Sequence, residues 1–312
     1  MRIVFIGTGE IGVPSLRALR QSEVHQLVGI VTQPDRPVGR SQRIQAPPIK
    51  QEIAEARLPI LQPERLRNPE AVAELRALQP ELIVVMAYGQ ILPKSVLEIP
   101  SVACLNLHAS LLPAHRGAAP IQAAIVTGDT ETGITVIYMD EGLDTGDILL
   151  QKKLTLSPDE TGGSLHNRLA ELAPEALLSA LEKLENRSAD RVPQDSSKAS
   201  YASKLDRAAG RIDWRESAVN IDRKIRAYDP WPGAFTEISD GSGKVRQLKI
   251  FRATVVEESV GDPGTMDRPN ESEVVVATGR GGLRLEQVQL EGKRRLTAVE
   301  FLRGFSSPKL HF

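Results

Sequence analysis

Apolar residues in the N-terminal part of the chain alternate between two spacings. Compact apolar runs of strand length, rich in β-branched residues, occur at 2–6, 24–31, 82–86, 102–107 and 133–139. Between them, apolar positions recur with helical spacing at 11–19, 69–78 and 119–127, and a longer helical pattern follows at 161–184. Strands that alternate with helices form βαβ units, which build a mainly parallel sheet. The pattern therefore predicts an α/β domain over residues 1–189.

The pattern changes after residue 189. Residues 190–205 are polar and aperiodic, which is typical of a linker. Beyond them the sequence predicts a helix at 217–227, short strands at 233–238, 245–253, 273–277 and 283–290, and a short final helix at 297–302. Glycine and aspartate separate these strands, as they do in small antiparallel barrels. Residues 206–312 are therefore predicted to form a second, barrel-like domain.

Composition narrows the class of protein. The chain has 312 residues, of which 41% are hydrophobic, and this is enough for two packed domains. Its one cysteine, Cys104, lies inside an apolar run, which excludes a disulfide framework and favours a reducing compartment. No apolar run is long enough to span a membrane, and Met1 leads directly into a predicted strand rather than a signal peptide. We therefore expect a cytoplasmic protein with no membrane partner.

Charge gives only a local indication of a nucleic-acid partner. The formal net charge is −1, so the overall field would not attract RNA. Residues 190–312 carry 21 basic against 18 acidic side chains, which is a weak excess. The loop 33–50 holds a basic cluster against one acid, Asp35, and the cluster consists of Arg36, Arg40, Arg43 and Lys50. On charge alone, a solvated surface loop is the commoner explanation of such a cluster.

Polar groups with catalytic chemistry follow two of the predicted strands. Asn106 and His108 stand two residues apart at the end of the run 102–107, so they point to the same face of the sheet. Open α/β sheets bind their ligands at the carboxyl ends of the strands. Asp144 lies in the acidic, glycine-punctuated loop 140–147, which follows another strand. An amide donor, an imidazole and a carboxylate can together form an acyl-transfer site without a metal or a covalent nucleophile.

Each of these features also has a structural explanation. A single histidine is more often a core or surface residue than a catalyst, and an asparagine at a strand end usually closes a turn. The coincidence of the three in one crevice favours a functional site. The loop 140–147 matches no EF-hand spacing, so we expect no metal. Ser110 lacks the Gly-x-Ser-x-Gly elbow of a nucleophile, and Cys104 is interpreted as a core residue.

A glycine motif supports a competing hypothesis. Gly7-x-Gly9-x-x-Gly12 lies between the first strand and the first helix, where a dinucleotide-binding fingerprint belongs. An NAD(P)-dependent oxidoreductase is therefore the alternative from a different class of protein. The acidic residue that should end the second strand is absent, because Thr32-Gln33-Pro34 stands there. The structural explanation is that the glycines permit a tight turn and close packing of the helix.

Ordered motifs along nearly the whole chain resemble one known family. They are Asn106-x-His108, Ser110-Leu111-Leu112-Pro113-x-x-Arg116-Gly117, Gly142-Leu143-Asp144-Thr145-Gly146-Asp147, Thr32-Gln33-Pro34-Asp35-Arg36-Pro37, Ala87-Tyr88-Gly89, Gly117-Ala118-Ala119-Pro120-Ile121-Gln122, Arg211-Ile212-Asp213-Trp214 and Pro230-Trp231-Pro232. Together they resemble the 10-formyltetrahydrofolate-dependent formyltransferases, and among these the branch that acts on methionyl-tRNA. One departure is Ala114-His115, where the family often has a basic residue followed by an aromatic one.

The resemblance implies a fold and a reaction. The first domain would be Rossmann-like, and the second would be an OB-fold-like barrel that binds tRNA. The formyl group of the co-substrate 10-formyltetrahydrofolate would pass to the α-amine of initiator methionyl-tRNA without a metal. Asn106 would hydrogen-bond the oxyanion, His108 would stabilise it or move protons, and Asp144 would orient His108 and assist proton transfer. Sugar-nucleotide and other small-amine N-formyltransferases, which share this core, are the nearest rivals.

The resemblance also implies the residues that contact each substrate. Those expected to bind the folate are Tyr88, Leu92, Ser110, Leu111, Leu112, Pro113 and Gly142. Those expected to contact tRNA are Arg36, Arg40 and Arg43. We expect the protein to act as a monomer.

Overall fold

A computed structural model describes residues 1–39, 42–55, 57–239, 243–305 and 308–312, so Arg40 lies outside the described residues. The chain divides into two compact units. Unit 1 comprises Met1–Pro120, Glu131–Thr155 and His166–Ser203, and unit 2 comprises Ile121–Thr130, Leu156–Leu165 and Lys204–Phe312. This division differs from the expected domains 1–189 and 206–312 with a linker at 190–205, because most of that linker belongs to unit 1.

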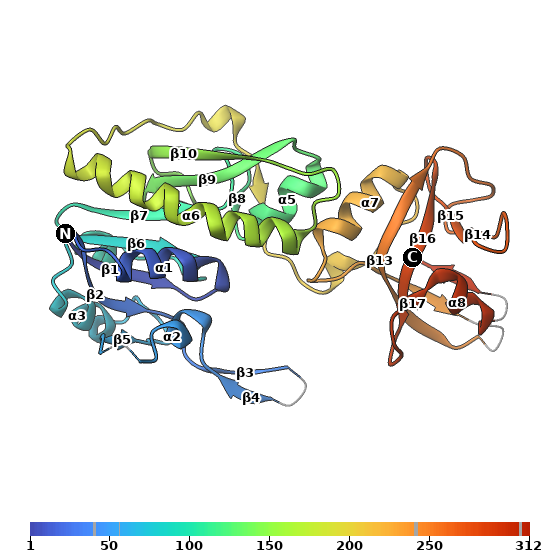
Figure 1. Ribbon diagram of the computed structural model, residues 1–312, viewed down its shortest axis with the longest axis horizontal. Coiled ribbons are helices and arrows are strands. Elements are labelled where there is room, and N and C mark those ends of the chain that lie inside the picture. The colour runs from blue at the N-terminus through green and yellow to red at the C-terminus, as the bar shows by residue number, and fades with distance from the viewer. Residues whose placement is uncertain (40–41, 56, 240–242, 306–307) are drawn as a thin grey trace. The chain divides into compact units, whose positions relative to one another are not determined.

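Unit 1 is built on a mixed sheet with the strand order β10-β9-β7-β6-β1-β2-β5, which can be followed in Figure 1. Its strands are β1 (Arg2–Gly7), β2 (Gln26–Val31), β5 (Ile60–Leu61), β6 (Leu82–Met86), β7 (Ala103–His108), β9 (Glu131–Tyr138) and β10 (Ile148–Thr155). β1, β2, β5, β6 and β7 pair in parallel, whereas β9 and β10 are antiparallel additions at one edge. The expected α/β fold with a mainly parallel sheet is confirmed.

The central strands form because their sequences are apolar throughout. All five residues of β6 are buried, as expected for a parallel strand that helices cover on both faces. The helices are α1 (Val13–Arg20), α2 (Pro48–Glu52), α3 (Pro69–Ala77), α4 (Lys94–Leu97), α5 (Pro120–Thr127) and α6 (Gly162–Glu185). The long helix α6 agrees with the pattern at 161–184. Among the described helices, none is both long and apolar enough to cross a membrane.

Two short pairs of strands were not expected from the sequence. β3 (Arg36–Val38) and β4 (Arg43–Gln45) form an exposed antiparallel hairpin within the region expected to be a loop. β8 (Arg116–Gly117) pairs in parallel with β11 (Tyr201–Ala202), which lies in the expected linker. The polar segment after α6 is therefore a structured part of unit 1.

The glycine motif after β1 serves packing within the protein. A Cβ atom at Gly7 would lie 2.8 Å from the carbonyl oxygen of Met86 in β6, and one at Gly12 would lie 3.2 Å from the ring of Phe5. Gly7 therefore needs to be glycine, and a side chain at Gly12 would require the Phe5 ring to shift, so both glycines help the turn into α1 to approach the sheet. The structural explanation of the motif accounts for these two glycines without a nucleotide.

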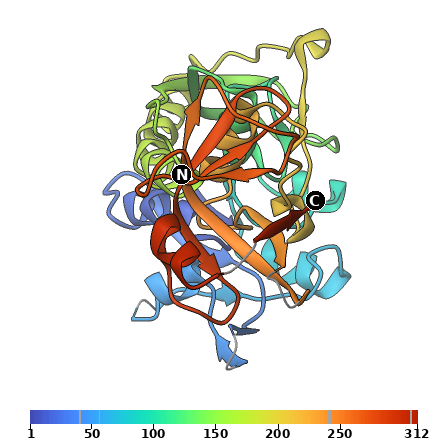
Figure 2. The same cartoon turned by 90° about the vertical axis from the view of Figure 1, so that its right-hand side faces the viewer.

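Unit 2 contains an antiparallel barrel with the strand order β14-β15-β16-β13-β12-β18, and β17 also pairs with β16. Its elements are α7 (Ala218–Ala227), β12 (Phe235–Ser239), β13 (Val245–Val256), β14 (Met266–Asp267), β15 (Val275–Ala277), β16 (Gly282–Leu290), β17 (Leu296–Thr297), α8 (Ala298–Arg303) and β18 (Lys309–His311). Figure 2 turns these strands, coloured orange to red, toward the viewer. The expected barrel is confirmed.

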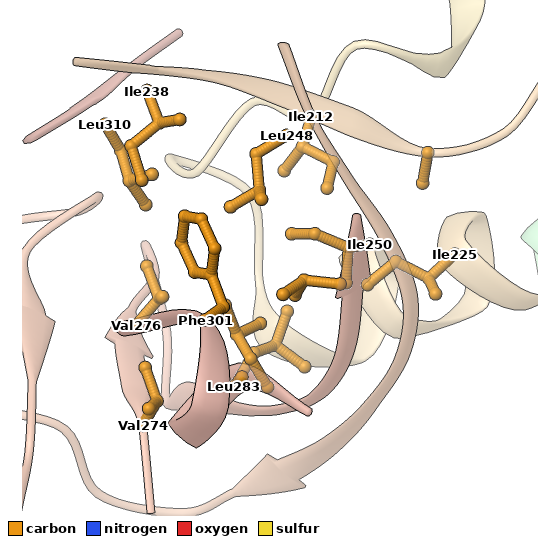
Figure 3. Packing of buried hydrophobic residues seen from close by; sticks show 14 of the residues in the cluster. Ile212, Ile225, Ile238, Leu248, Ile250, Val274, Val276, Leu283, Phe301 and Leu310 are labelled. Atoms are coloured by element: carbon orange, nitrogen blue, oxygen red, sulfur yellow. The ribbon is translucent and has the colours of Figure 1, made fainter. Parts of the chain in front are cut away.

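The core of the barrel is closed by side chains from α7 and α8. Phe301, from α8, lies among Leu248, Val276 and Leu310, which belong to three different strands (Figure 3). Trp214 is fully buried beside them, and its indole Nε1 donates to the hydroxyl of Thr236 over 3.1 Å. A buried indole N–H requires such an acceptor, so this bond holds the segment before α7 against β12.

Nearly all of α5 and the start of α6 belong to unit 2, where α7 and the residues after it bind main-chain groups of both helices. The guanidinium of Arg223 donates to the carbonyl oxygen of Thr127, at the end of α5, over 3.3 Å. At the start of α6, the carbonyl oxygen of Asp229 accepts from Gly163 N over 2.9 Å. Helix ends leave such groups without intrahelical partners. A single cut in the sequence therefore does not separate the two units.

Candidate active site

The structure brings Asn106, His108 and Asp144 together in unit 1. Asn106 and His108 both come from β7, two residues apart. The side-chain amide of Asn106 donates to Asp144 Oδ1 over 3.3 Å, and His108 Nδ1 lies 3.5 Å from Asp144 Oδ2. His108 is buried, whereas Asn106 is half-buried. One carboxylate therefore contacts both of the other groups.

Asp144 reaches this position through a loop that turns back toward β7. β9 runs antiparallel to β7, so its carboxyl end lies beside Cys104 rather than beside His108, with Met139 N donating to the Cys104 carbonyl over 2.8 Å. The loop then returns, and Asp144 adopts a left-handed backbone conformation with φ of 54°. A non-glycine residue is uncommon in this region, so surrounding contacts must hold it there.

Gly117 in β8 provides one of these contacts. Its main-chain N–H donates to Asp144 Oδ2 over 2.8 Å. Gly117 has φ of 115°, and a Cβ atom there would lie 2.6 Å from the carbonyl oxygen of Ala202 in β11. Only glycine therefore permits the β8–β11 pairing that presents this N–H to the carboxylate.

The tautomer of His108 is fixed by a neighbouring carbonyl. His108 Nε2 lies 2.9 Å from the main-chain oxygen of His115. A carbonyl oxygen can only accept, so Nε2 carries the proton and Nδ1, in the neutral ring, holds a lone pair on the side of Asp144. Burial lowers the pKa of His108, and this outweighs the opposing effects of the Asp144 carboxylate and the His115 carbonyl. The ring is therefore kept in its neutral form, in which Nδ1 can accept a proton.

The unusual pair Ala114-His115 supports the site through its main chain. His115 has φ of 60°, and its N–H donates to the hydroxyl of Ser200 over 2.9 Å. The carbonyl oxygen of Ala114 accepts from the Ser110 hydroxyl over 2.6 Å. The second imidazole, that of His115, is also buried. The preference for His108 as the reacting histidine rests on its contact with Asp144.

Residues 110–113, expected to bind the folate, make extensive contacts inside the protein. Ser110 and Leu112 are buried. The main-chain N–H of Leu112 donates to the Thr135 hydroxyl over 3.1 Å, and its carbonyl accepts from the Gln151 amide over 2.9 Å. Leu111 and Pro113 are half-buried. The internal bonds of Ser110 and Leu112 shape the turn after β7.

Tyr88 and Leu92 also lie in the protein core. Their side chains are each 3% exposed and pack in the cluster that contains β1 and β6 residues. Burial raises the pKa of the Tyr88 phenol to about 12. Contact of these two residues with a ligand would therefore use their main chain. Gly142 is exposed in the loop before Asp144, and its N–H donates to Asp140 Oδ1 over 3.0 Å.

Two exposed apolar side chains lie within the segments expected to bind the folate. Ile91 is 78% exposed and Leu143 is 52% exposed. Ligand pockets combine apolar surface with a few polar groups, so such side chains suit a flat aromatic ring system. The residues present at 89–92 and 140–144 are therefore compatible with a folate.

The hairpin β3–β4 carries two of the three cations expected to contact tRNA. Arg36 and Arg43 are exposed on its two strands, whereas Arg40 lies outside the described residues. Lys50, from the same basic cluster, instead pairs with Asp35 over 2.8 Å. A cavity of about 1410 Å³ is lined by hairpin residues and by the segment after β6, including Arg36, Val38, Gln45, Gly89, Gln90 and Ile91.

The sequence pattern did not identify three residues that hydrogen-bond the segments around the site. They are Gln194, Ser200 and Thr135. Gln194 and Ser200 lie in a polar, aperiodic segment, and nothing in its pattern distinguishes them from solvated linker residues. Thr135 faces the Ser110 carbonyl from β9, with its hydroxyl donating over 2.6 Å. An isolated threonine in an apolar strand could have indicated a buried hydrogen bond, because buried hydroxyls need partners.

The described residues give little support to a metal site or to a cysteine nucleophile. No group of three or more His, Cys, Asp or Glu side chains that could hold a metal ion occurs in the described part of the chain. Burial raises the pKa of the Cys104 thiol to about 12, so this thiol is a poor nucleophile. This agrees with the interpretation of Cys104 as a core residue.

Comparison with known proteins identifies the family. A family model described as formyl transferase matches residues 1–181, and one described as formyl transferase, C-terminal domain, matches residues 204–306. The methionyl-tRNA formyltransferase of Akkermansia muciniphila is 48% identical over 315 residues, covering 100% of this chain and 99% of that protein.

Solved structures share the fold at lower identity. The sugar 3N-formyl transferase WlaRD, solved with dTDP and 5-N-formyl-THF, has a TM-score of 0.66 at 17% identity, covering 94% of this chain and 99% of that one. HypX from Aquifex aeolicus, in complex with tetrahydrofolic acid, has a TM-score of 0.60 at 21% identity, covering 98% of this chain and 48% of that one. With the full-length relative at 48% identity, these matches place the chain in the formyltransferase family, among the methionyl-tRNA formyltransferases.

Proposed function

We propose that this protein transfers the formyl group of 10-formyltetrahydrofolate to the α-amine of initiator methionyl-tRNA. One observation carries the proposal: the Asp144 carboxylate contacts both the Asn106 amide and the His108 ring. An amide donor, a proton acceptor and a carboxylate that orients both are the groups that acyl transfer to an amine requires. The full-length relative of the same branch supports the choice of methionyl-tRNA as the acceptor.

His108 would accept the proton of the attacking amine. Its Nε2 proton is committed to the His115 carbonyl, so Nδ1 is the atom that takes up a proton. Once protonated, Nδ1 would become a donor toward Asp144 Oδ2, at present 3.5 Å away. Asp144 would thus hold His108 in place and stabilise its charged form.

Asn106 would act as an electrostatic stabiliser. Its amide has two N–H groups, and one of them donates to Asp144 Oδ1. This bond fixes the orientation of the amide, so the other N–H has a defined direction. A preorganised donor of this kind stabilises an oxygen that gains negative charge during transfer.

The folate, when bound, supplies the activated formyl group. The exposed Ile91 and Leu143 would bind apolar parts of it, and the main chain of 88–92 and 140–144 would orient it. Of the residues expected to bind it, Ser110 and Leu112 would act indirectly, by shaping the turn after β7. The two similar structures that were solved with folates support this class of co-substrate.

The hairpin β3–β4 would contact the phosphates of tRNA. Arg36 and Arg43 are exposed on a projecting hairpin, and Arg36 also lines the cavity shared with the segment 89–91. Phosphate contacts by such cations position a nucleic acid without reading its sequence. The barrel, with its weak excess of cations, would hold another part of the tRNA. We propose that the protein acts in the cytoplasm, because its one cysteine is an unpaired, buried thiol, as in proteins of reducing compartments. That it acts as a monomer stays a prediction.

Separate assays with three acceptors test this function. The protein is mixed with 10-formyltetrahydrofolate and, separately, with methionyl-tRNA, glycinamide ribonucleotide and an amino-sugar nucleotide. Methionyl-tRNA should be formylated with a kcat/KM far above that of the two small acceptors. Faster formylation of the sugar nucleotide would transfer the assignment to the small-amine branch. Nicotinamide-dependent hydride transfer without formyl transfer would instead favour the oxidoreductase.

A further inference from the structure

The segment between α6 and β11 reaches the catalytic loop through one side chain, Gln194. Its amide nitrogen donates to the main-chain oxygens of Asp144 and Gly146, over 2.8 and 2.7 Å. Its amide oxygen accepts from Nε and Nη2 of Arg116, over 3.1 and 2.8 Å. Both ends of one amide are therefore used, and they join the loop 140–147 to β8.

Both ends of the Gln194 amide are linked to Asp144. β8 supplies the Gly117 N–H that binds Asp144 Oδ2, and Arg116, the residue before it, is the one that Gln194 binds. Gln194 also holds the backbone of Asp144 itself, which lies in the left-handed region. The bonds to the Asp144 carbonyl and to the Gly146 carbonyl, two residues later, help to offset the cost of this conformation.

Arg116 makes the arrangement rigid. Its side chain is 2% exposed, and a buried guanidinium requires acceptors for its N–H groups. The amide oxygen of Gln194 accepts from two of these N–H groups, on Nε and Nη2. The main chain of Arg116 is held as well, because its N–H donates to the Ser200 carbonyl over 2.8 Å. Arg116 therefore fixes the amide oxygen of Gln194, while the amide nitrogen binds the loop 140–147.

We infer that Gln194 is a positioning residue for the formyl-transfer reaction, which fixes Asp144 against His108 and Asn106 through its bonds to the Asp144 and Gly146 carbonyls. This inference rests on the proposed role of Asp144. A loop freed from Gln194 would let the carboxylate move, and a displacement of about 1 Å at a reacting group can cost on the order of 10²-fold in rate. Substrate binding, which does not use these bonds, would change little.

Two substitutions separate positioning from simple anchoring. Gln194→Ala removes all of the contacts. Gln194→Glu keeps an acceptor for Arg116, and even strengthens that bond by its charge, but it offers the two carbonyls no donor. Ser197→Ala is the matched control, because its hydroxyl bonds only locally, to Asp195 Oδ1 over 2.6 Å. Asp144→Asn is measured in the same series.

Formylation of methionyl-tRNA by the full chain gives the readout. Both Gln194 variants should lose about 10- to 100-fold in kcat with KM little changed. The acid limb of the pH profile of Gln194→Ala should move to lower pH, as in Asp144→Asn, because a displaced carboxylate supports the protonated form of His108 less. Asp144 and His115 are the ionisable side chains that act on the pKa of His108, and Gln194→Ala alters neither residue. Gln194→Glu adds a negative charge at the loop, so this variant is judged by kcat. Ser197→Ala should behave as the unmodified protein.

The outcomes distinguish the inference from the proposed function. If Gln194→Glu keeps the kcat of the unmodified protein, only the anchoring of Arg116 matters and the inference is overturned. A rise in KM alone would overturn it too. If Asp144→Asn is fully active, the proposed role of Asp144 fails, whereas the proposed function fails only if the unmodified protein does not formylate methionyl-tRNA. If Gln194→Ala does not unfold in a cooperative thermal transition, the kcat of Gln194→Glu alone tests the inference.

Discussion

His108 Nε2 lies 2.9 Å from the main-chain carbonyl oxygen of His115, seven residues later in the chain. This bond assigns the proton to Nε2 and leaves Nδ1 to face Asp144. Because the acceptor is a main-chain atom, the side chain at 115 is not what fixes the tautomer. This explains how the site can hold Ala114-His115 where the family often has a basic and an aromatic residue.

The pH dependence of kcat/KM follows from this arrangement. Burial lowers the pKa of His108 from its ordinary value of 6.5, so the neutral ring that accepts a proton should persist below pH 6.5. Activity should therefore rise with pH along an acid limb centred below 6.5 and then level off. Asp144→Asn removes the charge that opposes the shift, so its limb should move lower still. A limb centred above 6.5 would contradict the assigned environment of His108.

Substitutions in the catalytic trio should act as one unit. Asn106→Ala should lower kcat by about 10²–10³, because it removes a donor to the developing charge. His108→Ala and Asp144→Ala should be similarly damaging, and combined changes should be far from additive. Tetrahydrofolate binding, measured by calorimetry, should largely survive the changes at Asn106 and His108. Near-normal turnover by any single variant would remove that residue from the mechanism.

The hairpin can be tested through the salt dependence of tRNA use. Arg36→Ala combined with Arg43→Ala should weaken the binding of methionyl-tRNA and flatten its dependence on salt by roughly one to two units of log slope, since fewer counterions are released. The matched control is Arg76→Ala with Lys94→Ala, which removes two exposed cations from α3 and α4. An unchanged slope in the hairpin variant would make β3–β4 a solvated surface.

The barrel contains its own reporter of stability. Both tryptophans of the chain, Trp214 and Trp231, lie in unit 2, so tryptophan fluorescence follows the unfolding of this unit. Thr236→Val should lower its free energy of unfolding by about 1–3 kcal/mol, because the Trp214 N–H is left buried without an acceptor. Thr236→Ser keeps the hydroxyl and is the control. Equal stability of the Val and Ser variants would show that the hydrogen bond is dispensable.

The sequence predicted those parts of the structure that depend on local pattern. The strand 82–86 and the helix 161–184 were found because burial imposes a continuous or periodic apolar pattern on them. Asn106 and His108 could be placed because they follow a buried strand. The role of Asp144 depended on family resemblance, since it follows an antiparallel strand and reaches β7 only through a loop that turns back.

Other parts carried no local signal. The hairpin β3–β4 is fully exposed, so neither strand shows the alternation of a half-buried strand. The side chains of Tyr88 and Leu92 lie in the core, which their spacing alone could not reveal, and their contact with a folate stays a prediction. Gln194 acts through long-range bonds to main-chain carbonyls, which leave no trace in the pattern of apolar and polar residues.

The pairing of β8 with β11 has a consequence for the order in which the protein is made. Gly117 and Asp144 leave the ribosome well before Ser200 and Ala202, the residues that hold β8 in register. A nascent chain that ends at residue 189 contains every strand of the large sheet and all of α6, but it lacks the strand that pairs with β8. The contacts that hold Gly117 against Asp144 can therefore be completed only after β11 has been translated.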